Sequence, residues 1–203
     1  MPHIDPIPFE DLPDDVRAMY EREQSHYGYV PNYALLFGHR PEVLERWAKL
    51  QSSIKRHQDR RRFELLTFVA AVALQSTLCA RAHGRVLSEY LSPEDVLALA
   101  RGETPSSCSP AEAAMIAFAR SVALDPNSVA RQDVERLREH GFGPAEIFDM
   151  TATVAGRAFW TKIIEALGVE ADVEAPPDDA FTRTLTVGRS PTFVPPRRLP
   201  PAG

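Results

Sequence analysis

The sequence is short of cysteine, long apolar runs and any excess of positive charge. Its 203 residues include only two cysteines, which excludes a disulfide scaffold and argues against a zinc site. No apolar run approaches the roughly 20 residues of a membrane helix, and the longest, residues 63–78, contains polar side chains. The N-terminus shows no basic segment followed by an apolar one, so we expect no secretory signal. These absences predict a cytoplasmic protein with reduced thiols and without a membrane, a metal or another cofactor.

The composition is that of an ordinary globular protein. Hydrophobic residues make up 44% of the chain and charged residues 25%, and the length suffices for one good core. The net charge of −5 argues against nucleic acid as a partner. A small-molecule substrate is therefore the partner that we expect.

Helix signals recur from residue 13 to residue 171. They are helical spacing of apolar residues, serine–proline starts at 92–93 and 109–110, and glycine stops at 102, 141 and 168. We predict an all-α fold for 13–171, after an extended segment at 1–12. The expected helices are 13–25, 31–37, 41–57, 63–74, 76–91, 93–101, 111–124, 128–140 and 145–167.

The C-terminal segment, 172–203, differs in character. Seven of the last 29 residues are proline, which disfavours a helix. Residues 181–187 alternate weakly and are compatible with a short edge strand. We interpret the segment as an extended proline-rich arm, either disordered or laid on a neighbouring subunit.

Cys79 and His83 are the first candidates for chemistry. Four residues apart on one helix, they share a face, and a helix beginning at Ser76 or Thr77 places Cys79 in its first turn. Free backbone N–H groups and an imidazole there favour a thiolate, the reactive form of cysteine.

Glu64 is a carboxylate within an apolar run, so it needs a partner or a raised pKa. If the chain turns near residues 74–77 and the two helices pack antiparallel, Glu64 lies opposite His83, and carboxylate, imidazole and thiol form a relay. An unbroken helix instead separates Glu64 from Cys79 by about 22 Å and prevents the relay.

Each residue also has an ordinary interpretation. A lone helix cysteine is usually a small core residue, a lone histidine is usually structural, and a glutamate can lie at a helix edge. Further candidates for substrate binding or support of the site are Ser76, Arg81, Tyr29 and Trp160. A solvated helix face is the alternative for Arg81, and packing is the alternative for Tyr29 and Trp160.

The spacing Glu64-x11-Ser76-x2-Cys79-x3-His83 resembles the carboxymuconolactone decarboxylase/alkylhydroperoxidase (AhpD-like) superfamily. Its peroxidase branch carries Glu-x11-Cys-x2-Cys-x3-His. GYVPN at 28–32, RPEVL at 40–44 and SPAE at 109–112 also agree with peroxidase-related members, and the resemblance covers about residues 9–171.

The resemblance implies an AhpD-like helical bundle that assembles as homotrimers or hexamers. It implies that Cys79 attacks peroxide and that His83 and Glu64 move the proton. Ser76 departs from the pattern, since serine cannot close a disulfide with an oxidised Cys79. Cys108, the other thiol, lies in an expected surface loop and is a weak candidate for that role.

Three alternative functions are compatible with these residues and this resemblance. The first is a peroxidase-type thiol oxidoreductase that uses Cys79, the proton relay and an external thiol reductant. The second is a cofactor-free lyase or isomerase of the decarboxylase kind, in which His83 and Glu64 act by acid–base chemistry on a small carboxylic acid or lactone. The third is a non-catalytic oligomeric member of the family.

Overall fold

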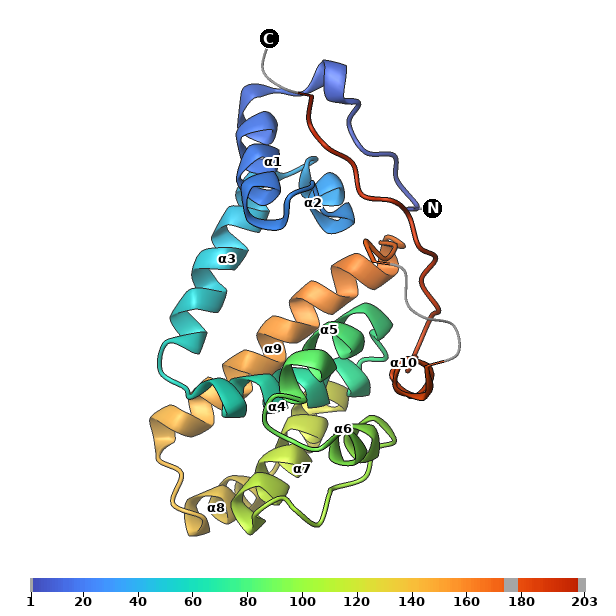
Figure 1. The fold of residues 1–203 in the computed structure, drawn as a ribbon. Coiled ribbons are helices and arrows are strands. Elements are labelled where there is room, and N and C mark those ends of the chain that lie inside the picture. Colours follow the sequence, from blue (N-terminus) through green and yellow to red (C-terminus); the bar gives the residue numbers. More distant parts are fainter. Residues whose placement is uncertain (1, 174–178, 201–203) are drawn as a thin grey trace. The chain divides into compact units, whose positions relative to one another are not determined.

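The structure, a computed structural model, describes residues 2–173 and 179–200 (Figure 1). The chain divides into two compact units. The first comprises residues 1–50, 163–175 and 191–203, and the second comprises residues 51–162 and 176–190. Regular structure in the described residues is helical apart from two isolated β-bridges, so the predicted all-α fold is confirmed.

The first unit contains α1 (Asp14–Tyr27), α2 (Asn32–Phe37), most of α3 (Pro41–Lys55) and the end of α9 (Pro144–Ala166). Tyr20 is fully buried, and its hydroxyl donates to the carbonyl of Leu35 at 3.2 Å. The C-terminal segment returns to this unit through two bridges, Val30 with Arg197 and Ala171 with Phe193. Backbone pairing thus holds part of the arm on its own chain.

The second unit holds the remaining helices around one apolar core. Its largest buried side chains include Leu65, Phe68, Leu87, Leu99 and Ile116. The unit contains residues 144–162 of α9 and 51–55 of α3. Its other helices are α4 (Arg60–Ala73), α5 (Thr77–Leu87), α6 (Pro93–Ala100), α7 (Pro110–Leu124), α8 (Arg131–Glu139) and α10 (Ala180–Thr184).

Side-chain caps explain where several helices begin. Ser109 and Glu112 form the predicted capping box at the start of α7, and Ser92 caps α6. α4 begins three residues before its predicted start because the Asp59 carboxylate accepts from the N–H of Arg62 at 2.9 Å. α8 begins later than predicted because Pro126–Ser128 forms a separate 3-10 turn.

The interpretation of residues 181–187 as an edge strand was wrong. Residues Ala180–Thr184 form the short helix α10, because the Asp179 carboxylate accepts from the N–H groups of Phe181 and Thr182 and supplies an N-cap. The rest of the predicted arm, residues 179–200, lies on its own chain. Residues 174–178 and 201–203 fall outside the described part.

Leu185, just after α10, anchors this segment to the second unit. It is 1% exposed and packs over Gly84, where an added Cβ would lie 2.9 Å from a Leu185 methyl and 3.1 Å from the Phe68 ring. Gly188 passes so close to the backbone of Gln75 that a Cβ there would overlap its carbonyl oxygen. The helical hairpin that carries Cys79 is therefore covered by a segment more than 100 residues further along the chain.

We predict that Leu185→Ala lowers the free energy of unfolding by about 2–5 kcal/mol, because it removes a buried side chain and leaves a cavity. Urea unfolding followed by circular dichroism measures the change. Leu124→Ala is the matched control, since Leu124 is 66% exposed and its loss should change stability by less than about 0.5 kcal/mol. Equal effects of the two substitutions would show that Leu185 does not anchor the segment.

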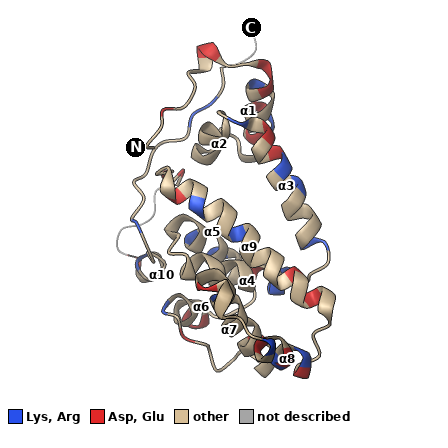
Figure 2. Cartoon of the chain, turned by 180° about the vertical axis from the view of Figure 1, so that it is seen from behind, with Lys and Arg blue, Asp and Glu red and all other residues tan. Residues whose placement is uncertain are grey.

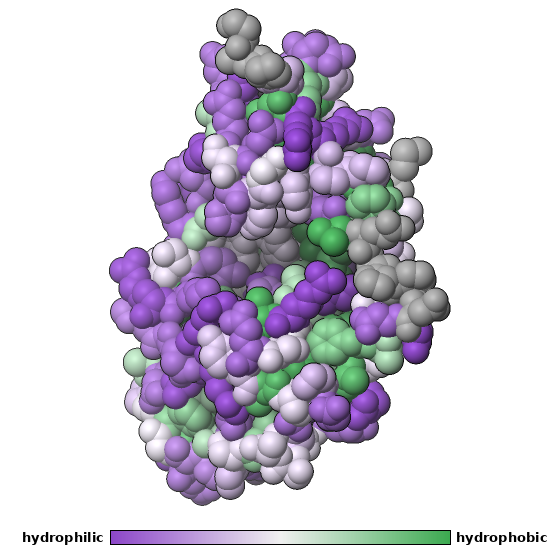
Figure 3. Space-filling model, viewed as in Figure 1, coloured by the Kyte–Doolittle hydropathy of each residue, from purple (hydrophilic) through white to green (hydrophobic). Residues whose placement is uncertain are grey.

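Acidic and basic residues occur together on several helices, and α8 carries both (Figure 2). On the face shown in Figure 3, hydrophilic side chains predominate and hydrophobic ones form separate patches. None of the described helices has the length and apolar character needed to cross a membrane.

Candidate active site

The site is built on the hairpin of α4 and α5 in the second unit. α4 ends at Ala73 and α5 begins at Thr77. Gln75 adopts a left-handed conformation, with φ of 55°, and the N–H of Ser76 donates to the carbonyl of Ala71 at 2.9 Å. The chain reverses direction here, as the sequence predicts.

The reversal brings Glu64 of α4 to His83 of α5. Glu64 Oε2 lies 2.7 Å from His83 Nδ1, and the exposed fractions of the two side chains are 6% and 20%. Burial alone would raise the pKa of the Glu64 carboxyl. The hydrogen bond and charge of His83, followed by the charges of Lys55 and Arg157, outweigh burial and hold the pKa below its ordinary value. Glu64 is therefore a carboxylate at neutral pH.

The imidazole of His83 is neutral in the same range. Burial lowers its pKa, the positive charges of Arg157 and Lys55 lower it further, and the hydrogen bond with Glu64 opposes them only in part. A neutral imidazole beside a carboxylate donates its Nδ1–H to it, which leaves Nε2 as an acceptor. The pair is thus arranged as a base held in one tautomer by a buried acid.

Cys79 lies one helical turn before His83 and is 4% exposed. In the described part of the chain its sulfur has one hydrogen-bond partner, and this is Arg157 rather than His83: Nη1 of Arg157 donates to Sγ at 3.5 Å. Of the predicted relay, the contact between carboxylate and imidazole is formed, and a guanidinium occupies the place beside the thiol.

Arg157 is a site residue that the sequence analysis missed. It lies on α9 and is only 6% exposed. The signal that marks it is a row of polar residues at helical spacing in an otherwise apolar helix, since Thr153 and Thr161, four residues to either side, are 2% and 1% exposed. A charged residue in the middle of a buried polar row indicates a site rather than a solvated face.

The other predicted site residues lie in different surroundings. Ser76 is fully buried at the N-cap position of α5, although its side chain does not cap the helix. The guanidinium of Arg81 donates to the Thr186 hydroxyl at 2.7 Å and so holds the C-terminal segment. Trp160 is half-buried, three residues after Arg157 on α9. Tyr29 belongs to the first unit, where its ring lies 6.2 Å from the ring of Tyr27.

Cys79 and Cys108 are both free thiols. Cys108 is half-buried against the core of the second unit rather than exposed in its loop. Burial raises the pKa of the Cys108 thiol, and the carboxylates of Glu112 and Asp95 raise it further. Cys108 is therefore a weak nucleophile at neutral pH.

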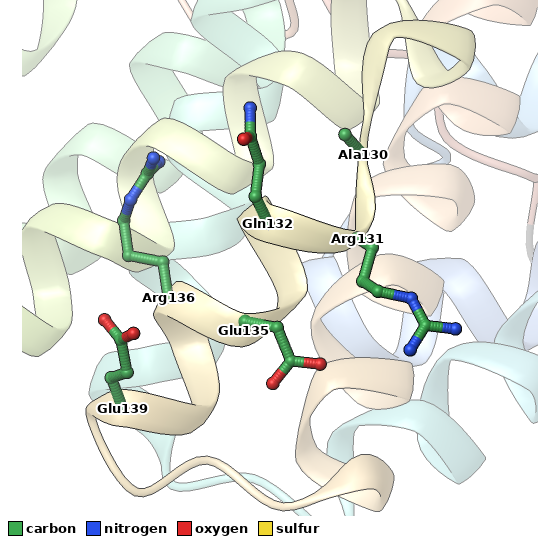
Figure 4. A pocket seen from close by; sticks show the side chains of 6 residues that line it. All are labelled: Ala130, Arg131, Gln132, Glu135, Arg136 and Glu139. Carbon is green, nitrogen blue, oxygen red and sulfur yellow. The ribbon is translucent and has the colours of Figure 1, made fainter.

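A separate hollow lies on the outer side of α8 (Figure 4). All of its lining residues come from positions 130–139, and acidic and basic side chains alternate around it. Glu135 pairs with Arg138 at 2.8 Å on the same helix. The hollow is a solvated helix face with no connection to Cys79.

The protein is therefore of the all-α class, and its candidate site consists of a Glu–His pair with a buried thiol one helical turn away. The profile of the carboxymuconolactone decarboxylase family matches residues 41–121, which include the whole hairpin. A peroxidase-related protein with an AhpD core from Ralstonia eutropha JMP134 superposes with a TM-score of 0.70 at 25% identity, over 93% of this chain and 98% of that one.

Two further structures share the fold. A peroxidase-related protein from Silicibacter sp. TM1040 gives a TM-score of 0.67 at 20% identity, over 83% of this chain and 90% of that one. The debrominase Bmp8 in complex with 2,3,4-tribromopyrrole gives a TM-score of 0.67 at 16% identity, over 90% of this chain and 94% of that one. A search of functionally curated proteins gives no match. The chain thus resembles the carboxymuconolactone decarboxylase family over residues 41–121 and shares its fold with AhpD-like, peroxidase-related proteins.

Proposed function

We propose that the protein is a thiol-dependent peroxidase in which Cys79 is the nucleophile and His83 and Glu64 form the proton-transfer pair. The observation that carries the proposal is the 2.7 Å contact between Glu64 and His83, one helical turn from a buried cysteine. A carboxylate that fixes the tautomer of an imidazole beside a nucleophile is a recurring solution for activating that nucleophile.

The chemistry balances with these groups. His83 Nε2 takes the proton of the Cys79 thiol, and the Glu64 carboxylate stabilises the imidazolium that results. The thiolate attacks one peroxide oxygen, so an S–O bond forms while the O–O bond breaks. The departing oxygen takes the electron pair of that bond and the proton from His83, which leaves a sulfenic acid and an alcohol or water.

An external thiol completes the cycle. Ser76 carries no sulfur and Cys108 is a weak nucleophile, so neither side chain is suited to resolve the oxidised Cys79. One equivalent of external thiol condenses with the sulfenic acid and releases water. A second equivalent reduces the resulting mixed disulfide and restores Cys79. Assembly as a trimer or hexamer remains a prediction from the family resemblance.

Intact-mass spectrometry tests the proposal. We expect one equivalent of hydrogen peroxide to add about 16 mass units (one oxygen atom) at Cys79 and none at Cys108, because only the first thiol has an activating site. Peptide mapping locates the oxidation. An inert Cys79 in the folded protein contradicts the proposal.

A second candidate function is a cofactor-free lyase or isomerase of a small carboxylic acid or lactone. It is favoured by the fact that Glu64 and His83 make a complete acid–base pair without the sulfur. Bmp8, named as a debrominase, shows that this fold accommodates more than one activity. Substitution of Cys79 separates the candidates, because acid–base turnover would largely survive it and peroxide reduction would not.

A further inference from the structure

Arg157 is the buried charge of the site with the fewest partners. Its guanidinium pairs with no carboxylate in the described chain, and its Nε is buried without a hydrogen-bond partner. Burial of a guanidinium without a carboxylate opposes stability, so its retention needs another reason. Its position against Sγ of Cys79 provides one.

We propose that Arg157 is a further catalytic residue of peroxide reduction: its Nη1, which donates to Sγ, stabilises the Cys79 thiolate that attacks the peroxide. The proposal rests on the peroxidase function and adds to it. Nη1 already reaches the sulfur. A hydrogen bond from a charged guanidinium to an anion is stronger than one between neutral groups.

The surrounding charges favour this assignment. The groups that act on one another here are Glu64 on α4, His83 on α5, Lys55 at the end of α3 and Arg157 on α9. Two of these groups are positively charged, and before the thiol ionises the Glu64 carboxylate is the one anion among the four. When His83 takes the thiol proton, the thiolate that forms lies beside Arg157, and a guanidinium binds a thiolate more strongly than a thiol.

In the reaction step, Arg157 gains or loses no proton. The sulfur attacks the near peroxide oxygen and forms the S–O bond, while the electron pair of the O–O bond moves to the far oxygen. That oxygen takes the proton that His83 received from the thiol. Nη1 of Arg157 stabilises the thiolate until the attack.

The first test measures the thiolate without peroxide. We expect Arg157→Gln to slow alkylation of Cys79 by iodoacetamide at pH 7 by about ten- to a hundredfold. Lys162→Gln is the matched control, since it removes one positive charge from the exposed side of the same helix and should leave the rate unchanged. Unchanged alkylation in folded Arg157→Gln overturns the proposal.

The second test isolates the positive charge. Arg157→Lys keeps that charge, so we expect alkylation and peroxide consumption within about threefold of wild type. Alkylation as slow in Arg157→Lys as in Arg157→Gln overturns the role of the charge. A wild-type protein that alkylates rapidly but consumes no peroxide overturns the peroxidase function, while the contact between Arg157 and Cys79 is still tested by alkylation.

Urea unfolding identifies a merely structural role. A residue that only holds the fold would lower the unfolding midpoint when replaced and leave Cys79 reactivity in the folded fraction unaltered. We expect the opposite for Arg157→Gln: an unfolding midpoint equal to or higher than that of wild type, together with the slower alkylation.

Discussion

Cys79→Ser should abolish peroxide consumption, with a loss of roughly a thousandfold or more, as removal of the nucleophile causes in other covalent enzymes. A serine hydroxyl is not ionised at neutral pH and does not form a sulfenic acid. The side chain is 4% exposed and serine is slightly smaller and more polar, so we expect only a modest loss of stability. Consumption of hydrogen peroxide with excess external thiol measures the activity.

Cys108→Ser is the matched control for this substitution. Cys108 is the other free thiol, half-buried and with a raised pKa, so its loss should leave the peroxide rate within about twofold. If Cys108→Ser is as inactive as Cys79→Ser, a second thiol takes part in turnover. If Cys79→Ser retains its turnover, the lyase or isomerase is the better account of the site.

Glu64→Gln should slow peroxide consumption by about a hundredfold, the contribution expected of a group that supports general acid–base catalysis. The amide still accepts the Nδ1–H of His83, so the geometry is kept and only the charge is lost. The carboxylate raises the pKa of His83 against the effect of burial. Without it the imidazole is a weaker base for the thiol proton.

The pH dependence of stability tests the pair of Glu64 and His83 independently. The folded pKa of His83 lies below its ordinary 6.5, so the unfolded chain binds a proton that the folded chain excludes, and the free energy of unfolding falls as pH drops below about 6.5. The folded pKa of Glu64 is also lowered, so a further loss follows below about 4.5.

In Glu64→Gln, the loss below pH 4.5 should be smaller than in wild type, whereas Glu139→Gln, at an exposed position on α8, should show the wild-type profile. Urea unfolding at a series of pH values makes the comparison. Identical acid profiles for Glu64→Gln and wild type would mean that the carboxylate is not paired in the folded protein.

The helices and the turn between α4 and α5 are predictable because their causes are local. Capping serines, prolines at first helical positions and apolar spacing act within a few residues, and they place most helix ends within three residues of those observed. The pairing of Glu64 with His83 follows from the same local turn, because an antiparallel hairpin brings residues equally far from the turn together.

Two features were not predictable in this way. Residues Ala180–Thr184 form a helix because Asp179 caps them and Leu185 enters the core. The prolines on either side favoured an extended segment, so the cap and the apolar anchor were not recognised in the sequence. The contact between Arg157 and Cys79 joins α9 to α5, and the two residues are 78 positions apart in the sequence. No local rule specifies which face of α9 meets α5.

The sequence by itself determined the class of fold and the placement of Glu64, Cys79 and His83 on one helical hairpin, because helix propensity, capping and residue spacing depend on neighbouring residues. Only the tertiary structure decided which charge lies beside the sulfur and that the C-terminal segment covers the hairpin. Those contacts depend on how helices that are distant in the sequence pack, and this packing depends on all the side chains of the core together.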